Sequence, residues 1–288
     1  MAEIKVTIAA RSDIGRVRSN NEDAFTVAEL ETGALLPDFA AFDLPDRGLL
    51  LAVSDGMGGH QAGEVASSLV LDSLRQALTA AQSGPVQARL ELAVLRANTT
   101  VRDAARAQNK EGMGATLTAV ILIGGEAYIA EVGDSRAYLC RDGRLHQLTR
   151  DQSLLQMLVD GGALSEEDRK HSRHRNVIVQ AMGLADEVRV AIGRLALRRL
   201  DTVLVCSDGV SNAASHDELR RILSWHAPRR AAARLIDLAN ARGGEDNLTV
   251  VVAQFDGIGL EQASPSESIS DTFEVLQAFA GGEADENA

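Results

Sequence analysis

Acidic residues in short segments, most of them with a glycine close by, are the residues of this chain best suited to chemistry. Five such segments occur, and each borders a run of apolar residues. They are Asn20-Asn21-Glu22-Asp23, Ser54-Asp55-Gly56, Gly133-Asp134-Ser135, Ser207-Asp208-Gly209 and Glu245-Asp246-Asn247. An acid at the end of a strand can point into a cleft while the strand fixes its backbone. A glycine beside it lets a ligand or the main chain approach closely.

Taken alone, an Asp-Gly pair after a strand is usually a turn in which the aspartate bonds its own backbone. Five such segments together indicate more, because converging carboxylates repel one another unless a cation lies between them. Ligand sets made only of oxygen select hard ions such as Mg²⁺ or Mn²⁺. No Asp-x-Asp-x-Asp-Gly spacing of an EF-hand occurs, and Gly56-Met57-Gly58-Gly59 lacks the Lys-Ser/Thr of a phosphate-binding P-loop.

Short runs rich in Val, Ile and Leu predict the strands that must position these acids. The runs are Ile4–Ala9, Leu49–Val53, Leu117–Ile123, Tyr128–Val132, Ala137–Cys140, Val188–Ile192, Thr202–Cys206 and Leu248–Phe255. Gly124-Gly125 and Asp142-Gly143 are typical of tight hairpins. Residues 115–148 are therefore expected to form an antiparallel meander.

Helical spacing of apolar residues predicts Gln61–Ala81 and Pro85–Ala107 as helices. Ser215 and Glu218 form the pattern of a capping box that opens a helix to about Trp225. A further helix is expected from Pro228 to Arg242, before Gly243-Gly244.

The order of these elements lacks strict strand–helix alternation, which argues against a doubly wound parallel sheet. We expect an α+β fold, a four-layer α-β-β-α sandwich of two antiparallel sheets flanked by helix pairs. The polar residues 150–185, with helical patterns at Ser153–Asp160 and Ser165–Lys170, are interpreted as a small flap insert. Glu29–Asp46 is expected to form a surface loop or an extended hairpin.

Charge and composition limit the partners. Of the net charge of −12, −7 lies in residues 257–288, which leaves −5 for residues 1–256. A mildly acidic body disfavours nucleic acid as the main partner. The acidic residues 257–288 are expected to be a disordered tail, in which Thr272–Phe279 could form a short docking helix. Cys140 and Cys206 have no metal-ligand or disulfide spacing, and no segment approaches the ~18 apolar residues of a membrane span. We expect a cytoplasmic monomer that does not bind membranes.

The ordered motifs resemble those of the PPM (type 2C) metal-dependent protein serine/threonine phosphatases of bacterial type. The resemblance covers roughly residues 5–255 and rests on six motifs in family order. These are Gly15-Arg-Val-Arg18 through Asp23, Asp55-Gly-Met-Gly-Gly-His60 with Ala62-Gly63-Glu64, Met113-Gly-Ala-Thr116, Gly133-Asp134-Ser135-Arg136, Ser207-Asp208-Gly209, and Asp246-Asn247-Leu-Thr-Val250. By this resemblance, residues 1–256 form a phosphatase catalytic domain.

The resemblance implies unequal roles for the acids. Asp55 is expected to bridge two divalent cations, Mn²⁺ or Mg²⁺, one of which also binds the Gly56 carbonyl. Asp208 and Asp246 are expected to complete the ligands of the other ion, and Glu22 and Asp23 to hold metal-bound waters. Asp134, with Asp208, is expected to support a weaker third ion.

The implied reaction is hydrolysis of phosphoserine and phosphothreonine in proteins by a metal-activated water. Arg18 is expected to hold the substrate phosphate, because its planar fork meets two oxygens at once. His60 is either the general acid for the leaving oxygen or a histidine that orients water or substrate. Phosphorylated proteins, including a cognate Ser/Thr kinase or its substrates, are the implied partners. The alternative is a catalytically weak regulatory or phosphoprotein-binding module of the same family.

Overall fold

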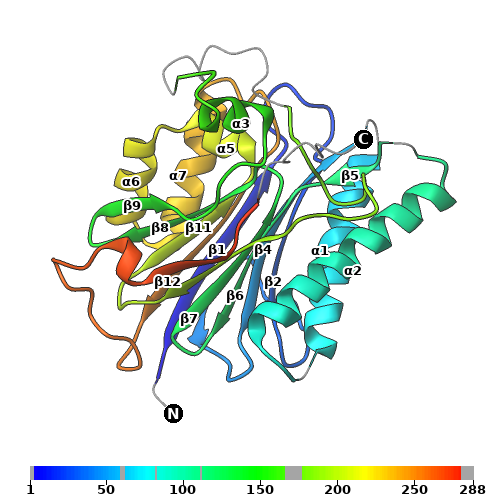
Figure 1. Cartoon of the computed structure of the whole chain (residues 1–288). Helices are drawn as coiled ribbons and strands as arrows, with labels where there is room; N and C mark the ends of the chain where they lie inside the picture. The colour runs from blue at the N-terminus through cyan, green and yellow to red at the C-terminus, as the bar shows by residue number, and fades with distance from the viewer. Residues whose placement is uncertain (1–2, 59–61, 82, 111, 166–176, 280–288) are drawn as a thin grey trace.

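The computed structural model of the chain describes residues 3–58, 62–81, 83–110, 112–165 and 177–279. Two sheets of antiparallel strand pairs form its centre (Figure 1). The strand order of the first sheet is β3-β1-β12-β11-β8-β9, and that of the second is β13-β10-β7-β6-β4-β2. The first sheet contains β1 (Lys5–Asp13), β3 (Phe39–Asp43), β8 (Arg136–Arg141), β9 (Arg144–Gln147), β11 (Thr202–Cys206) and β12 (Leu248–Asp256). The second contains β2 (Asp23–Glu29), β4 (Leu49–Met57), β6 (Leu117–Ile123), β7 (Glu126–Val132), β10 (Ala191–Ala196) and β13 (Phe273–Gln277), and β5 (Gly114–Ala115) pairs with the end of β4.

Helices cover the outer face of each sheet. Helices α1 (Ala62–Ala80) and α2 (Val86–Ala107) pack on the second sheet, and α5 (Asp208–Ala213), α6 (His216–Trp225) and α7 (Pro228–Ala241) pack on the first (Figure 1). Three buried apolar clusters fill the spaces between the four layers, and the middle one, between the sheets, includes Ile8, Val53 and Phe255. This confirms the predicted α+β sandwich of two antiparallel sheets. None of the described helices combines the length and apolarity needed to cross a bilayer.

Local sequence signals place most elements to within a few residues. The capping box at Ser215 is present: its backbone N–H donates to Glu218 Oε2 at 3.0 Å. Helix α7 begins with Pro228 in its first turn. Both predicted hairpins form, since Gly124, Asp142 and Gly143 adopt the left-handed backbone that these tight turns require.

The meander predicted over residues 115–148 is wrong at its middle. Strands β6 and β7 lie in the second sheet, whereas β8 and β9 lie in the first. The chain crosses between the sheets at Gly133-Asp134-Ser135, where Gly133 has a φ of 109°. A Cβ on Gly133 would lie 2.8 Å from the Thr116 side chain, so only glycine fits this crossing.

Two further segments differ from expectation. Within Glu29–Asp46, expected as a loop or hairpin, Phe39–Asp43 forms the edge strand β3 along β1. The strand predicted at Val188–Ile192 begins later, as β10 from Ala191. In both cases the partner strand is far away in sequence, so local propensity gives no sign of the pairing.

The predicted flap begins with helix α3 (Leu154–Asp160), which Ser153 caps by accepting from the Gln156 N–H, as expected. Of the second helix predicted there, residues 166–170 lie outside the described part of the chain. The bounds of the flap stay a prediction.

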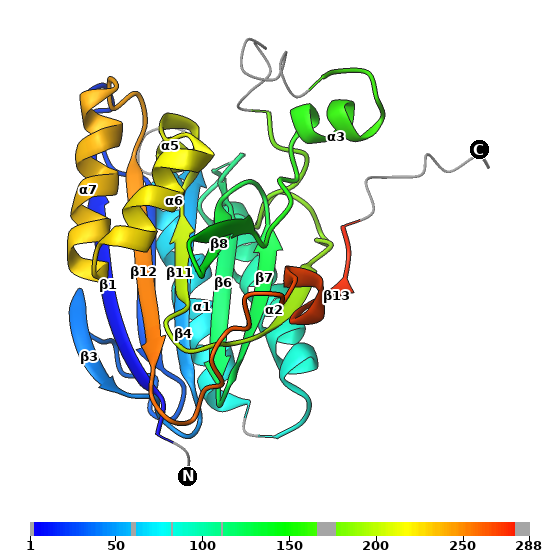
Figure 2. The same cartoon turned by 90° about the vertical axis from the view of Figure 1, so that its left-hand side faces the viewer.

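The predicted disorder of the tail is wrong for residues 257–279. Strand β13 pairs with β10 at the edge of the second sheet, where a docking helix was expected (Figure 2). Phe273 packs against the core between the sheets. The acidic composition of this segment favours disorder. Composition does not show that the segment pairs with an open sheet edge and takes part in a buried ion cluster. Residues 280–288 lie outside the described chain.

The ion cluster under the tail is centred on Arg141, whose side chain is 8% exposed. Arg141 donates two hydrogen bonds to Asp201, which is fully buried, at 2.8 and 2.6 Å. It also donates to Thr272 Oγ1 at 2.6 Å and to Glu267 at 3.3 Å. The cluster therefore ties the tail to β8 and to the turn before β11.

We expect Arg141→Met to lower the free energy of unfolding by about 3–5 kcal/mol, because it leaves the buried Asp201 carboxylate without its cation. The matched control is Arg199→Met, which removes an exposed pair with Asp256 and should cost less than about 1 kcal/mol. Chemical denaturation of both variants measures the difference. Equal losses would contradict the structural role given to Asp201 and Arg141.

Candidate metal centre

Strand register brings the predicted acids to one end of the sandwich. Asp23 and Asp55 are directly opposite each other in the β2–β4 pair. Asp208 follows β11 and Asp246 precedes β12; because these strands are antiparallel neighbours, the two residues meet at one edge. Asp134 lies in the crossing between the sheets. Burial, followed by repulsion from the four other aspartates, raises the pKa of Asp55 well above its usual value, so the five acids lie near one another.

Asp55 differs from the prediction in one respect. Strand β4 continues to Met57, so Asp55 lies within a paired strand and not beyond its end. Its backbone N–H donates to Thr116 Oγ1 at 3.0 Å, and Gly56 pairs with Ala115 of β5. The backbone of Asp55 is thus held on one side by residues 115–116 and on the other by its pairing with Asp23 of β2, which fixes the direction of its side chain.

Buried hydroxyl groups form hydrogen bonds with Asp23 and with the backbone next to Asp55. Ser207 Oγ donates to Asp23 Oδ2 at 2.7 Å and accepts from the Thr249 N–H at 3.0 Å. Ser54 Oγ donates to the Thr116 carbonyl at 2.6 Å. The serine of each Ser-Asp-Gly segment is therefore a tether between strands, a role that the sequence pattern did not indicate.

The glycines after Asp55 and Asp208 are required by close packing. A Cβ on Gly56 would lie 2.0 Å from the Gly63 carbonyl oxygen. A Cβ on Gly209 would lie 2.2 Å from the carbonyl oxygen of Asn247. Each glycine thus lets another segment of the site approach its aspartate.

Two of the buried acids have oxygens that no described protein group satisfies. Asp23 Oδ1 and Asp208 Oδ1 are buried and have no hydrogen-bond partner among the described residues. Burial, followed by repulsion from neighbouring acids, raises the pKa of Asp23 to about 7 and that of Asp208 to about 6. Burial also raises the pKa values of Asp55 and Asp134. Buried oxygen ligands with unused lone pairs fit a hard divalent cation.

The acids do not yet form a closed ligand cage. Among the described residues, no three His, Cys, Asp or Glu side chains are arranged to hold one ion as they stand. Asp246 Oδ2 accepts from Arg18 Nη2 at 2.8 Å. The predicted phosphate-binding residue and a predicted metal ligand therefore contact each other.

Asn247 holds the loop that carries Arg18. Its amide donates to the carbonyls of Ile14 and Asn20, both at 3.0 Å, and its Oδ1 accepts from the Glu22 N–H at 2.8 Å. The sequence shows only that Asn247 follows Asp246. Its partners are more than 220 residues away, so its role could not be read from local spacing.

Glu22 lies beside the Asp55-Gly56 segment. Its carbonyl accepts from the Gly56 N–H at 3.1 Å, and its carboxyl group would be 2.7 Å from a Cβ on Gly63. Asn20 donates to Glu22 Oε1 at 3.2 Å. His60, the other candidate for catalysis, lies outside the described residues, so its role stays a prediction.

Arg136 and Asp151 form an ion pair next to the predicted flap, and Arg136 partly compensates the charge of the nearby acids. Arg136 donates to both carboxyl oxygens of Asp151, at 2.7 and 2.5 Å. The Arg136 guanidinium also lowers the pKa values of Asp134 and Asp208 against the effect of burial. Asp151 was not singled out from sequence, because nothing in the polar flap segment distinguishes it from its neighbours.

The raised pKa values predict that Mn²⁺ stabilises the protein more at pH 8 than at pH 5.5. Without metal, Asp23 and Asp208 take up protons on folding, so their contribution to stability falls as pH rises from about 4 to 7. A cation binds the ionised form and reverses that trend. With Mn²⁺ at ~100 times its dissociation constant, we expect a rise in Tm of roughly 5–10 °C at pH 8. Thermal unfolding with Mn²⁺ or chelator measures it, and an equal rise at both pH values would contradict it.

Comparison with known proteins agrees with this arrangement. The family model described as protein phosphatase 2C matches residues 27–248. The serine/threonine protein phosphatase PstP of Mycobacterium tuberculosis is 37% identical over 92% of this chain, which spans about half (48%) of that relative's length. The serine/threonine phosphatase stp of Listeria monocytogenes is 33% identical over 85% of this chain and 94% of its own length.

Solved structures agree as well. The catalytic domain of PstP in complex with two manganese ions is 37% identical, with a TM-score of 0.74 over 88% of this chain and 99% of that one. The Streptococcus agalactiae serine/threonine phosphatase is 31% identical, with a TM-score of 0.77 over 86% of this chain and 98% of that one. With the converging aspartates, these matches show that the chain belongs to the protein phosphatase 2C family.

Proposed function

We propose that this protein hydrolyses phosphoserine and phosphothreonine in proteins, and that residues 1–256 form the catalytic domain, with a flap at about residues 150–185. The observation that carries the proposal is the set of buried aspartates with unpartnered oxygens beside Arg18. Such a set suits metal-assisted hydrolysis of a phosphate ester.

The proposed metal ligands are Asp55 and the Gly56 carbonyl for one ion, and Asp55, Asp208 and Asp246 for the other. Bound divalent cations supply a hydroxide at neutral pH by lowering the pKa of a coordinated water. Glu22 and Asp23 orient waters of this centre, and Ser207 and Thr116 hold the acids in place. The two manganese ions of the PstP catalytic domain support a binuclear centre here.

We infer that Mn²⁺ or Mg²⁺ fills these sites, since the donors are all oxygen. Asp134 and Asp208 are the proposed ligands of a weaker third ion. Their mutual repulsion and the position of Asp134 in the crossing between the sheets support that proposal.

Arg18 is the proposed phosphate-binding residue. Its guanidinium now pairs with Asp246, and half of the side chain is exposed, so a phosphate can reach it. With Asp246 holding a cation, Arg18 would be free to donate to two phosphoryl oxygens. His60 is proposed as the group that protonates the leaving oxygen or orients water.

Phosphorylated proteins, including a cognate Ser/Thr kinase or its substrates, are the proposed partners. The acidic net charge supports a protein partner over nucleic acid. We propose a cytoplasmic monomer. A catalytically weak regulatory module is a lesser candidate, because all the predicted acidic ligands are present in the sequence.

Asp208→Asn is expected to lower kcat on a phosphothreonine peptide at least ~100-fold, about 2.7 kcal/mol, because it removes a ligand charge. The metal-free variant should be no less stable than the wild type, since the substitution removes a buried carboxylate. Asp237→Asn, at an exposed acid of α7, is the matched control. Phosphate release with Mn²⁺ and thermal unfolding in chelator give the two readouts.

Full activity of the wild type in chelator would contradict metal-assisted hydrolysis. Binding of phosphopeptide without turnover would favour the regulatory module. Faster turnover of nucleotides than of phosphopeptides would show a small-molecule phosphohydrolase.

Arg18→Ala is expected to lower kcat/KM about 10- to 100-fold, mainly through KM, because a charge-assisted bond to phosphate is worth about 1.5–3 kcal/mol. Arg16→Ala, in the same loop, is the matched control, and steady-state kinetics on the phosphopeptide measure both. An equal loss in the control would show that the loop, and not the Arg18 guanidinium, is responsible.

A further inference from the structure

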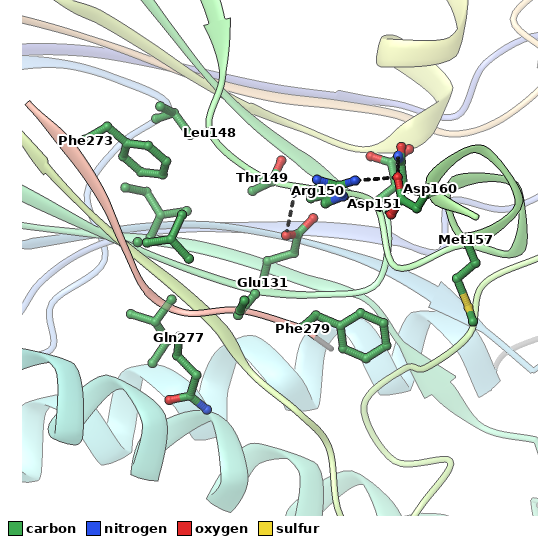
Figure 3. Close-up of a pocket in the computed structure, with 17 residues that line it drawn as sticks. Glu131, Leu148, Thr149, Arg150, Asp151, Met157, Asp160, Phe273, Gln277 and Phe279 are labelled. Carbon is green, nitrogen blue, oxygen red and sulfur yellow. Dashed lines mark hydrogen bonds and ion pairs between the residues drawn. The ribbon is translucent and has the colours of Figure 1, made fainter. Parts of the chain in front are cut away.

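A second pocket lies between the start of the flap, strands β7 and β10, and the C-terminal segment 273–279 (Figure 3). Its volume is about 360 Å³, within the range of small-molecule sites. The lining contains none of the proposed metal ligands. It is a separate cavity that the proposed reaction does not use.

The pocket walls are mainly apolar. Leu148 and Phe273 lie on one side of Glu131, and Met157 and Phe279 on the other (Figure 3). Ile129 and Ile192 belong to the strands behind them. Two of these side chains come from the C-terminal segment, so the pocket exists only because that segment pairs with β10.

Glu131 is a buried acid in this mainly apolar lining. The residue is 2% exposed, and its Oε2 accepts from the Arg150 N–H at 2.9 Å. Its Oε1 is buried and has no hydrogen-bond partner among the described residues. An unpaired buried carboxyl oxygen is costly, and it is the mark of a missing donor.

The other charges of the lining are already matched. Arg150 pairs with Asp160, and Asp151 pairs with Arg136. In the described structure, Glu131 is thus the one acid of the lining that no cation contacts through an ion pair. Burial, followed by repulsion from Asp151, holds the pKa of Glu131 well above its usual value.

We propose that this pocket binds a small organic cation with an apolar body. An ammonium or amidinium head supplies the donor that Glu131 Oε1 lacks, and the body packs among Phe273, Phe279 and Met157. Aromatic faces also attract such a head. An anionic ligand is disfavoured by the three acids of the lining, and a single water, at ~30 Å³, would leave most of the cavity empty.

The pocket is joined to the metal centre through Gln152, which is fully buried. The Gln152 backbone N–H donates to the Gly133 carbonyl at 2.8 Å, and its Oε1 accepts from the Gly133 N–H at 2.8 Å. Its side-chain amide donates to the Glu131 carbonyl at 3.1 Å. Gly133 precedes Asp134, so a ligand that shifts Glu131 or the start of the flap also shifts Asp134. The site is therefore an effector site, a conclusion that rests on the proposed function.

The test uses the full chain loaded with Mn²⁺ and three probes of one shape: benzamidine, benzamide and benzoate. By isothermal titration, benzamidine should bind at least 10 times more tightly than the neutral or anionic probe. Glu131→Gln should weaken benzamidine binding at least 10-fold, while still accepting from the Arg150 N–H. Glu126→Gln, at an exposed position of the same strand, should leave binding unchanged.

Met157→Trp provides a second variant, which fills the cavity from α3 without touching Glu131 and should also weaken binding at least 10-fold. Equal affinity for benzamidine and benzamide, or unchanged binding in both Glu131→Gln and Met157→Trp, would overturn the proposed site. Saturating benzamidine should change phosphopeptide turnover at least twofold in the wild type and not in Glu131→Gln. Binding without that change would overturn the effector role, while failure of the proposed function would appear as absent turnover with binding intact.

Discussion

Repulsion among buried carboxylates is the constraint on which the site depends. Five aspartates from distant parts of the chain meet at one end of the sandwich, and each raises the free energy of the ionised form of its neighbours. Two of their buried oxygens have no partner among the described residues. A fold that keeps such a cluster together must hold the aspartates in place with buried polar contacts. A bound cation would then compensate their mutual repulsion.

The two sheets provide that support. The Ser207 hydroxyl joins the end of β11 in the first sheet to β2 in the second, and hydrogen bonds of Ser54 and Thr116 join β4 to the segment before β6. Asn247 binds the loop of Arg18 to the start of β12. The acids are held by short strands and buried polar contacts, whereas Arg18 lies in a loop with half its side chain exposed. This arrangement suits the proposed function, in which the acids stay fixed and only the more exposed Arg18 exchanges partners when a phosphoprotein binds.

The C-terminal segment extends the second sheet beyond what the acidic site requires. Its strand β13 closes the edge at β10, and the Arg141 cluster fastens it to the first sheet. This segment also forms one wall of the pocket around Glu131. The same contacts that order the tail thus create a cavity next to the flap, and Gln152 connects that cavity to the crossing that carries Asp134.

The amino-acid sequence by itself determined the kinds of residue and the elements that carry them. Apolar runs located most strands, capping and turn residues located the ends of helices and hairpins, and motif order indicated which acids belong together. These signals are local, and they depend on propensities that act within a few residues.

Only the tertiary structure decided which sheet receives each strand and which side chains meet. The chain crosses between the sheets at Gly133, where the neighbouring Thr116 leaves no room for a side chain. Asn247, Asp151 and Ser207 gained their roles from partners far away in sequence, and the tail became ordered because a sheet edge was open to it. Such contacts depend on burial and on hydrogen bonds across the whole fold, which no local pattern encodes.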